Sequence, residues 1–178
     1  MPRLFTGLEI PDACAATLAG ACGGGGVGAR WIEPGDYHIT LRFIGDVDLG
    51  VARDIAETLG DVRRPPTAVL FEGLGWFGGD KPRAIVARVK PNRELTELQA
   101  DHERRLRRIG LAPDPRNFTP HVTLARLRSV GPTAVADYLT TRGALAAPPF
   151  EASRFVLYSA RDSVGGGPYV VEAAYPLS

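Results

Sequence analysis

The 178-residue chain has little cysteine, and its two cysteines, Cys14 and Cys22, form neither a CxxC motif nor a metal-ligand spacing. This argues against a disulfide scaffold and a structural zinc site, and we expect both thiols to be buried in a reducing compartment. Long hydrophobic runs are also missing: the apolar stretch Ala13–Cys22 is too short to cross a membrane. Acidic rather than basic residues precede it, which argues against a signal peptide. We expect a cytoplasmic monomer without a membrane segment.

A strong net charge is absent as well, since 21 basic residues are balanced by 20 acidic ones, for a net charge of +1. Such a chain cannot gather long nucleic acids non-specifically, although short or terminal substrates remain compatible with it. Lysine occurs only at Lys81 and Lys90, and all other basic residues are arginine. Arginine suits bidentate contacts to phosphate, but a coding bias towards arginine explains this composition more simply.

Glycine (21 residues) and proline (15 residues) are frequent, which predicts many turns around short elements. Strands are expected at Arg3–Ile10, Tyr37–Ile44, Ala68–Gly75, Ala84–Val89, His121–Leu127, Phe155–Ser159 and Tyr169–Tyr175. Helices are expected at Pro11–Cys22, Asp48–Leu59, Glu94–Ile109 and Thr133–Thr141. Loops or turns are expected at Gly23–Gly26, Trp76–Arg83, Pro113–Pro120, Pro148–Pro149 and Gly165–Gly167. Because several strands are joined by short turns, the pattern predicts an α+β fold rather than a doubly wound sheet.

One tetrapeptide pattern, His–aliphatic–Thr–aliphatic, occurs twice, at His38–Leu41 and at His121–Leu124. Each copy lies in an expected strand that has helical segments on both sides. The rest of the two chain halves does not align. The repeat therefore indicates two related lobes, each presenting one copy of the motif.

Alternate residues of a strand share a face, so His38 should lie beside Thr40, and His121 beside Thr123. Two such strands facing each other would place two imidazoles and two hydroxyls around one small anion. The intervening residues, which we expect to point into a core, are Ile39, Leu41, Phe43, Val122 and Leu124.

This arrangement suits the cleavage of a phosphodiester. One neutral histidine takes a proton from the attacking oxygen, and one protonated histidine gives a proton to the leaving oxygen. Histidine can serve both roles near neutral pH, and threonine hydroxyls can donate hydrogen bonds to the non-bridging oxygens. A single copy would be weak evidence, but two copies in a chain with three histidines are much stronger.

The third histidine, His102, falls on the apolar stripe of the expected helix Glu94–Ile109, which favours a buried structural role. The arginines of that helix are interpreted as a solvated face near its C-terminal end, with contact to RNA as the alternative. There is no HExxH motif and no cluster of histidine and cysteine ligands, so we expect no metal site.

Six segments together resemble a known family: Arg3–Phe5, Arg30–Trp31, His38–Gly45, Pro120–Arg126, Phe155–Tyr158 and Tyr175–Leu177. They are similar to the bacterial and archaeal RNA 2′,3′-cyclic phosphodiesterases, also called 2′-5′ RNA ligases, of the two-histidine phosphoesterase superfamily. The resemblance covers nearly the whole chain. It implies a single bilobal α+β domain over residues 1–178, with pseudo-symmetric lobes of antiparallel sheet, flanking helices and an active site in the central cleft.

The same resemblance implies hydrolysis of RNA 2′,3′-cyclic phosphate ends to a 2′-phosphate, without a metal or cofactor. The substrate would be an RNA or oligonucleotide with a cyclic phosphate end. His38 would be the proton donor and His121 the acceptor, while Thr40 and Thr123 would hold the phosphate. Arg126 matches a substrate-binding arginine of the family.

Strict alternation, however, places Arg126 on the face opposite His121, so it reaches the cleft only if the strand bends after Leu124. Arg42 lies on the His38 face by the same count and is a second candidate for substrate binding. Phe5 and Tyr158 could stack on a base, with core packing as the alternative.

Three other functions remain open at this stage. The fold could serve as a nucleotide- or RNA-end-binding module without turnover, although both histidines and both threonines are present. The enzyme could instead join RNA halves through a 2′-5′ bond without ATP, which is the reverse chemistry of the same groups. The near-neutral charge also allows a cyclic phosphodiesterase that acts on small nucleotides.

Overall fold

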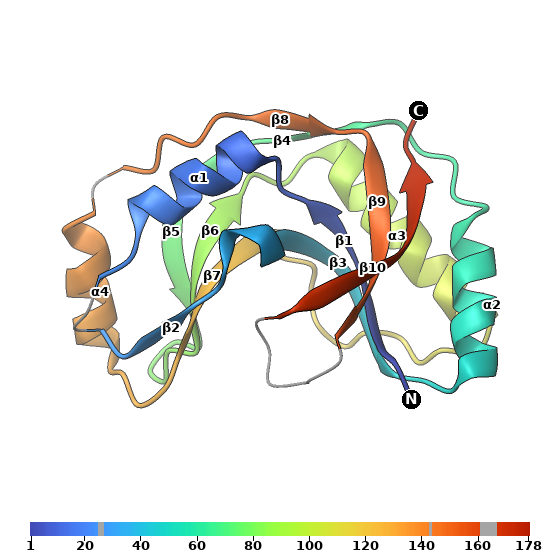
Figure 1. Cartoon of the computed structure of the whole chain (residues 1–178), viewed down its shortest axis with the longest axis horizontal. Coiled ribbons are helices and arrows are strands. Elements are labelled where there is room, and N and C mark those ends of the chain that lie inside the picture. Colours follow the sequence, from blue (N-terminus) through green and yellow to red (C-terminus); the bar gives the residue numbers. More distant parts are fainter. Residues whose placement is uncertain (25–26, 143, 161–166) are drawn as a thin grey trace.

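The computed structural model describes residues 1–24, 27–142, 144–160 and 167–178 (Figure 1). Its strands are β1 (Arg3–Glu9), β2 (Ala29–Trp31), β3 (His38–Asp46), β4 (Thr67–Val69), β5 (Phe71–Phe77), β6 (Ala84–Val89), β7 (His121–Leu127), β8 (Phe150–Ala152), β9 (Arg154–Ala160) and β10 (Tyr169–Pro176). Its helices are α1 (Asp12–Ala21), α2 (Leu49–Leu59), α3 (Arg93–Arg108) and α4 (Pro132–Thr140), with a 3-10 turn η1 (Pro34–Asp36). The predicted α+β fold is confirmed.

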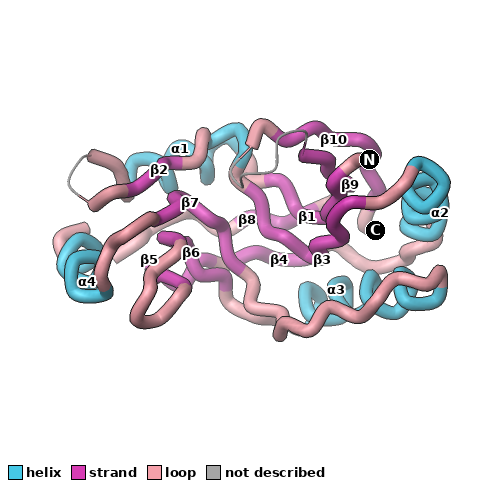
Figure 2. Tube along the Cα trace, turned by 90° about the horizontal axis from the view of Figure 1, so that it is seen from below, coloured by secondary structure: helices cyan, strands magenta, loops and turns pink. Residues whose placement is uncertain are grey.

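The main sheet is antiparallel and has the strand order β10-β9-β1-β3-β7-β6-β5, with β2 paired to β7. Its first half consists of β10, β9, β1 and β3, and its second half of β7, β6, β5 and β2. Only one residue pair, Ile39 with Val122, joins the halves through β3 and β7. Figure 2 shows these two strands side by side near the middle of the molecule. Each half therefore carries one copy of the histidine motif, on the strand at the junction.

The helices cover different parts of this sheet. Helix α3 packs against β3 and also contacts α2, whereas α4 lies near β5 and α1 near η1 (Figure 1). Helix α3 shows why the sequence predicted it well. Its apolar stripe of Leu95, Leu98 and Leu106 is fully buried. The Asn92 side chain caps its start by accepting a hydrogen bond from the backbone N–H of Leu95 at 2.9 Å.

The start of α2 and the burial of both thiols also agree with expectation. The carboxylate of Asp48 caps α2 by accepting a hydrogen bond from the backbone N–H of Val51 at 2.8 Å. Cys14 and Cys22 are buried members of the hydrophobic core, and both thiols are free.

Among the helices that the structure describes, none is long and apolar enough to cross a membrane.

Three expectations about elements were wrong. The single strand expected at Ala68–Gly75 is two strands, because β4 leaves the main sheet to pair with β8 while β5 pairs with β6. Strand β5 extends to Phe77, so the expected loop begins two residues later than predicted. Strands β2 and β8 were missed, because three residues are too few to show an alternating pattern. Gly25, Gly26, Gly165 and Gly166 of the expected glycine loops lie outside the described residues.

Candidate active site

The pairing of β3 with β7 brings the two motifs together at one pocket. Ile39 lies opposite Val122, so these two side chains share one face of the sheet. The residues that flank Ile39 on β3 and Val122 on β7 therefore share the opposite face. His38, Thr40, His121 and Thr123 all line a single pocket of about 570 Å³. The structure thus assembles the four side chains that the repeat predicted to lie together.

Both imidazole rings are held by a backbone carbonyl two residues earlier in the chain. His38 Nδ1 lies 2.9 Å from the carbonyl oxygen of Asp36, and His121 Nδ1 lies 2.6 Å from that of Thr119. Because a carbonyl can only accept, each Nδ1 must carry the hydrogen. Each Nε2 is then left for chemistry, as an acceptor on a neutral ring or a donor on a charged one.

Thr40 completes the His38 side of the site. Its Oγ1 lies 3.0 Å from His38 Nε2. When the ring is neutral, the hydroxyl donates to Nε2, and when the ring is protonated, Nε2 donates instead. The hydrogen bond between Thr40 and His38 can therefore persist when the imidazole ring gains or loses a proton.

Three aromatic rings surround His38. Their centroids lie 4.9 Å (Phe5), 5.4 Å (Tyr158) and 5.1 Å (Tyr169) from the imidazole. Phe5 and Tyr158 are only 5% and 7% exposed and stack on each other. They form the wall behind His38, so the core-packing interpretation of these two residues is confirmed, and base stacking is not available to them.

His121 has a different environment, on the second half of the sheet. The Phe77 ring meets it edge-on at 4.5 Å, and Arg88 lies directly opposite it on β6. The Arg88 guanidinium lies 5.8 Å from the centre of the Phe77 ring. An aromatic ring and a cation therefore adjoin His121, whereas an aromatic cluster encloses His38.

These surroundings disfavour protonation of both rings. Burial is the largest cause and lowers the pKa of His38 to about 4, against the raising effect of its hydrogen bond to the Asp36 carbonyl. Burial also lowers the pKa of His121, and the charges of Arg126 and Arg88 add to that effect. The charge of Arg126 likewise lowers the pKa of His38. In the unliganded protein, both histidines are therefore mainly neutral at pH 7.

A β-bulge brings Arg126 into the pocket. On β6, Val86 pairs with Thr123 and Ile85 with Ala125, so Leu124 has no partner. An extra residue of this kind reverses the alternation of the strand. Arg126 consequently shares the face of His121 and lines the same pocket. The strand thus has the bend after Leu124 that the sequence analysis required for Arg126 to reach the cleft.

The same irregularity in β3 shows that the interpretation of Arg42 was wrong. On β1, Gly7 pairs with Thr40 and Thr6 with Arg42, which leaves Leu41 unpaired. Arg42 therefore points away from His38, is 5% exposed, and forms a 2.5 Å ion pair with Glu103. It also donates hydrogen bonds to the backbone carbonyls of Phe43 and Ala112. Arg42 is a structural residue of the first half.

Phe43 was also misplaced, since it was expected in the core. The bulge at Leu41 turns it onto the pocket face, where it is 40% exposed. The Arg116 guanidinium lies 5.9 Å from the centre of its ring. Phe43 and Arg126 both stand five positions after their histidine, so an alignment of the two motifs could have identified Phe43. The other pocket-lining residues that sequence reasoning did not single out include Asp36, Phe77, Arg83, Arg116 and Tyr169.

His102 lies in the core, as expected. Its ring is fully buried, its Nδ1 lies 2.8 Å from the carbonyl oxygen of Leu98, and it meets Phe155 edge-on at 4.6 Å. In the part of the chain that the structure describes, no three His, Cys, Asp or Glu side chains are grouped so that they could hold a metal ion.

Comparison with known proteins supports this picture. The model of the family described as "LigT like Phosphoesterase" matches residues 9–86 and 88–169. The chain is 30% identical over 152 residues to an RNA 2′,3′-cyclic phosphodiesterase of Aquifex aeolicus, covering 82% of this chain and 81% of that protein. It is 39% identical over 105 residues to the protein of that name from Aeropyrum pernix, covering 58% of this chain and 60% of the relative. A match to the protein of that name from Geobacillus stearothermophilus covers only 32% of the length of that relative.

Solved structures share the fold over the full length. E. coli LigT complexed with 3′-AMP superposes with a TM-score of 0.81 at 20% identity, covering 100% of this chain and 99% of that one. A protein of Thermus thermophilus gives a TM-score of 0.79 at 20% identity, covering 98% of this chain and 97% of that one. At this identity the superpositions establish the architecture, while the family model spans both histidine motifs. The chain belongs to the LigT-like phosphoesterase family.

Proposed function

We propose that this protein hydrolyses the 2′,3′-cyclic phosphate end of RNA to a 2′-phosphate, with His38 as proton donor and His121 as general base. One observation carries the proposal: two imidazoles with their Nδ1 atoms tied to carbonyls face one pocket, together with Thr40 and Thr123. The names of the relatives agree with this substrate class.

The proposed step uses only these groups and water. His121 Nε2 takes a proton from a water molecule, whose oxygen forms a new bond to phosphorus. The bond between phosphorus and the ribose 3′ oxygen breaks, and His38 Nε2 gives its proton to that oxygen. The products are a 2′-phosphate monoester and a 3′-hydroxyl. The proton left on His121 then exchanges with solvent, and His38 is protonated again.

Binding of the substrate would set the protonation states. His38 must carry a proton to act as donor, although burial lowers its pKa to about 4 in the free protein. A cyclic phosphate is an anion, and an anion next to an imidazole stabilises the charged ring. Entry of the substrate should therefore raise the pKa of His38 and recruit the proton that the reaction needs.

The remaining pocket groups would stabilise the charge that builds on the non-bridging oxygens. Thr40 and Thr123 can each donate a hydrogen bond, and Arg126 can donate through its guanidinium. Because neither motif contains a carboxylate, we propose that the reaction needs no metal ion. The cytoplasmic location and the monomeric state stay predictions.

A substrate panel tests this function directly. Ribonucleotides and oligoribonucleotides with a 2′,3′-cyclic phosphate are incubated with the protein and a chelator, and the product ends are mapped. We expect turnover to a 2′-phosphate at an undiminished rate. Activity that depends on an added divalent ion would contradict the metal-free step, and a 3′-phosphate product would reverse the leaving oxygen. Binding without turnover would favour the end-binding module, and joined 2′-5′ products would favour ligation.

A further inference from the structure

The strand arginines of the two halves of the main sheet differ in whether a carboxylate neutralises their charge. In the first half, each arginine on a described strand is paired with a carboxylate: Arg3 with Asp46, Arg42 with Glu103, and Arg154 with Glu9, at 3.1, 2.5 and 2.6 Å. In the second half, the strand arginines are Arg30, Arg88 and Arg126. Within the described residues, none of these three forms an ion pair or a side-chain hydrogen bond.

Two of the unpaired arginines occupy directly opposite positions on neighbouring strands. Arg30 on β2 is the cross-strand partner of Arg126 on β7, so both side chains stand on the pocket face of the sheet. Like charges in directly opposite positions destabilise a sheet. An anion bound between them would remove this repulsion, and no carboxylate of the described residues forms an ion pair with either arginine.

A third cation joins this pair. Arg126 also lies opposite Ala84 of β6, and the exposed Arg83 immediately precedes Ala84. Arg83 and Arg126 both line the pocket. Arg30, Arg83 and Arg126 therefore form one unpaired cationic area, here called the arginine surface, at the edge of the pocket and on the second half alone.

We propose that the arginine surface binds successive phosphates of an RNA end, with Arg126 at the reacting phosphate and Arg30 and Arg83 at the phosphates of the RNA body, so that the strand leaves the pocket across β7 and β2 rather than over the first half. This inference rests on the proposed function. A cyclic mononucleotide with a 5′-hydroxyl has no second phosphate, whereas every longer RNA has at least one on the 5′ side of its last nucleotide. The surface therefore selects RNA ends over free cyclic nucleotides, although the chain as a whole has a net charge of only +1.

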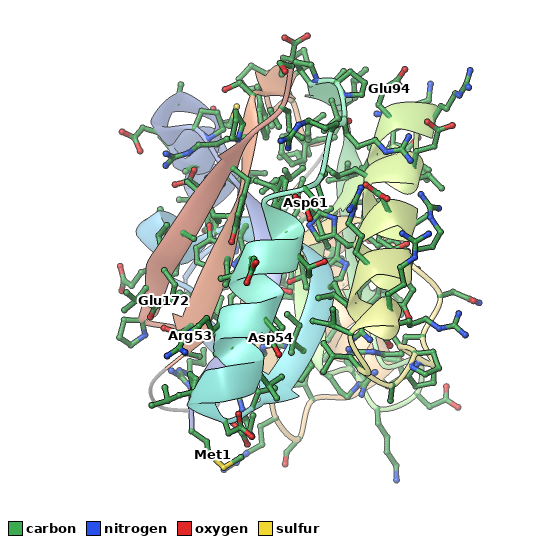
Figure 3. The ribbon with its side chains drawn as sticks, turned by 90° about the vertical axis from the view of Figure 1, so that its right-hand side faces the viewer. Met1, Arg53, Asp54, Asp61, Glu94 and Glu172 are labelled. Carbon is green, nitrogen blue, oxygen red and sulfur yellow. The ribbon has the colours of Figure 1, made fainter. Side chains whose placement is uncertain are left out.

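The test compares two substrates in four proteins. The ratio of kcat/KM for a ten-nucleotide RNA ending in a 2′,3′-cyclic phosphate to that for cytidine 2′,3′-cyclic phosphate is measured in the wild type, Arg30→Gln, Arg83→Gln and Arg53→Gln. Arg53 is an exposed arginine on α2, at the other end of the molecule from β2 (Figures 1 and 3). The ratio should fall about two- to fivefold in each of the first two variants and stay unchanged in Arg53→Gln.

A binding measurement keeps the two proposals separate. Fluorescence anisotropy with the same RNA ending in a 2′-phosphate should show weaker binding in Arg30→Gln and Arg83→Gln, with a smaller dependence on salt. If no cyclic phosphate is turned over, the proposed function fails while this measurement still decides the arginine surface. Unchanged ratios and unchanged anisotropy in both variants would overturn it, as would a preference for phosphatidylserine vesicles over RNA.

Discussion

Phe43 and Arg126 occupy equivalent places in the two copies of the histidine motif. Each is the fifth residue after its histidine, and each is turned onto the pocket face by an unpaired leucine, Leu41 or Leu124. The repeat therefore includes the bulge as well as the histidine and threonine. It places an aromatic ring on one side of the pocket and a cation on the other.

Arg126 is expected to bind the reacting phosphate, because its charge reaches both histidines in one pocket. Arg126→Met should lower kcat/KM about 10- to 100-fold, the loss expected for a hydrogen bond to a charged group. The measurement is steady-state turnover of a cyclic-phosphate dinucleotide. Arg128→Met, which changes an exposed arginine two residues later, is the matched control. Equal effects of the two substitutions would argue for a general charge effect.

Removing either imidazole should abolish most of the catalysis. His38→Ala and His121→Ala should each lower kcat about 10²–10⁴-fold, the usual contribution of a general acid or base. Since His38 packs against Phe5 and Tyr158, thermal unfolding of each variant must accompany the assay. Full turnover by a folded His121→Ala protein would refute the two-histidine mechanism.

The pH optimum should lie below the value expected from the sequence. Two histidines at their ordinary pKa predict a bell-shaped rate profile centred near neutrality. Burial lowers the pKa of His38 to about 4 and also lowers the pKa of His121. The state with one proton on the pair is then most populated below pH 6.5. The profile of kcat/KM, which reports the free protein, should peak there. The profile of kcat should lie at higher pH, because bound phosphate raises the pKa of His38. A flat profile of kcat/KM would contradict the paired mechanism.

Arg88 should tune His121 without contacting the substrate. Its positive charge lowers the pKa of His121, so Arg88→Met should raise that pKa and move the limb of the kcat/KM bell that reports His121 to higher pH. Gly75→Ala offers an independent change, because a Cβ there would lie 2.5 Å from the Arg88 guanidinium and displace it. A profile that shifts in neither variant would show that Arg88 has only a structural role.

His102 should make the protein less stable in acid. The native protein holds its pKa at about 4 through burial, whereas the unfolded chain titrates near the ordinary value of 6.5. The unfolded state therefore binds more protons between these values, and stability falls as the pH drops from 6.5 to 4. The loss is about 3 kcal/mol for this one group. His102→Leu should flatten that part of the curve, measured by urea unfolding at several pH values. An unchanged slope would show that His102 stays neutral in both states.

Much of the fold was predictable because its signals are local. Residues close together in the sequence determine the apolar stripe of α3, the caps at Asp48 and Asn92, and the strand His121–Leu127. The two histidines and two threonines were predictable because the motif occurs twice. Their meeting at one pocket required only that the two strands pair.

The rest depended on pairing between distant strands. The bulges at Leu41 and Leu124 arise from the register of β3 on β1 and of β7 on β6. Neither bulge changes the alternation of hydrophobic residues in the sequence. The assumption of strict alternation therefore placed Phe43 and Arg42 on the wrong faces of the strand. The position of Arg126 stayed undecided for the same reason. Partners such as Glu103 for Arg42 come from other elements and cannot be read from the strand itself.

The order of the strands along the chain also determines when the candidate active site can form. The sheet half that carries His38 contains β9 and β10, which supply Tyr158 and Tyr169, two of the three rings around the imidazole. A chain that is still emerging from the ribosome has both histidines long before it has those strands. The surroundings of His38 are therefore complete only after β9 and β10 have been added, and a chain that lacks these strands carries both motifs without the aromatic wall behind His38.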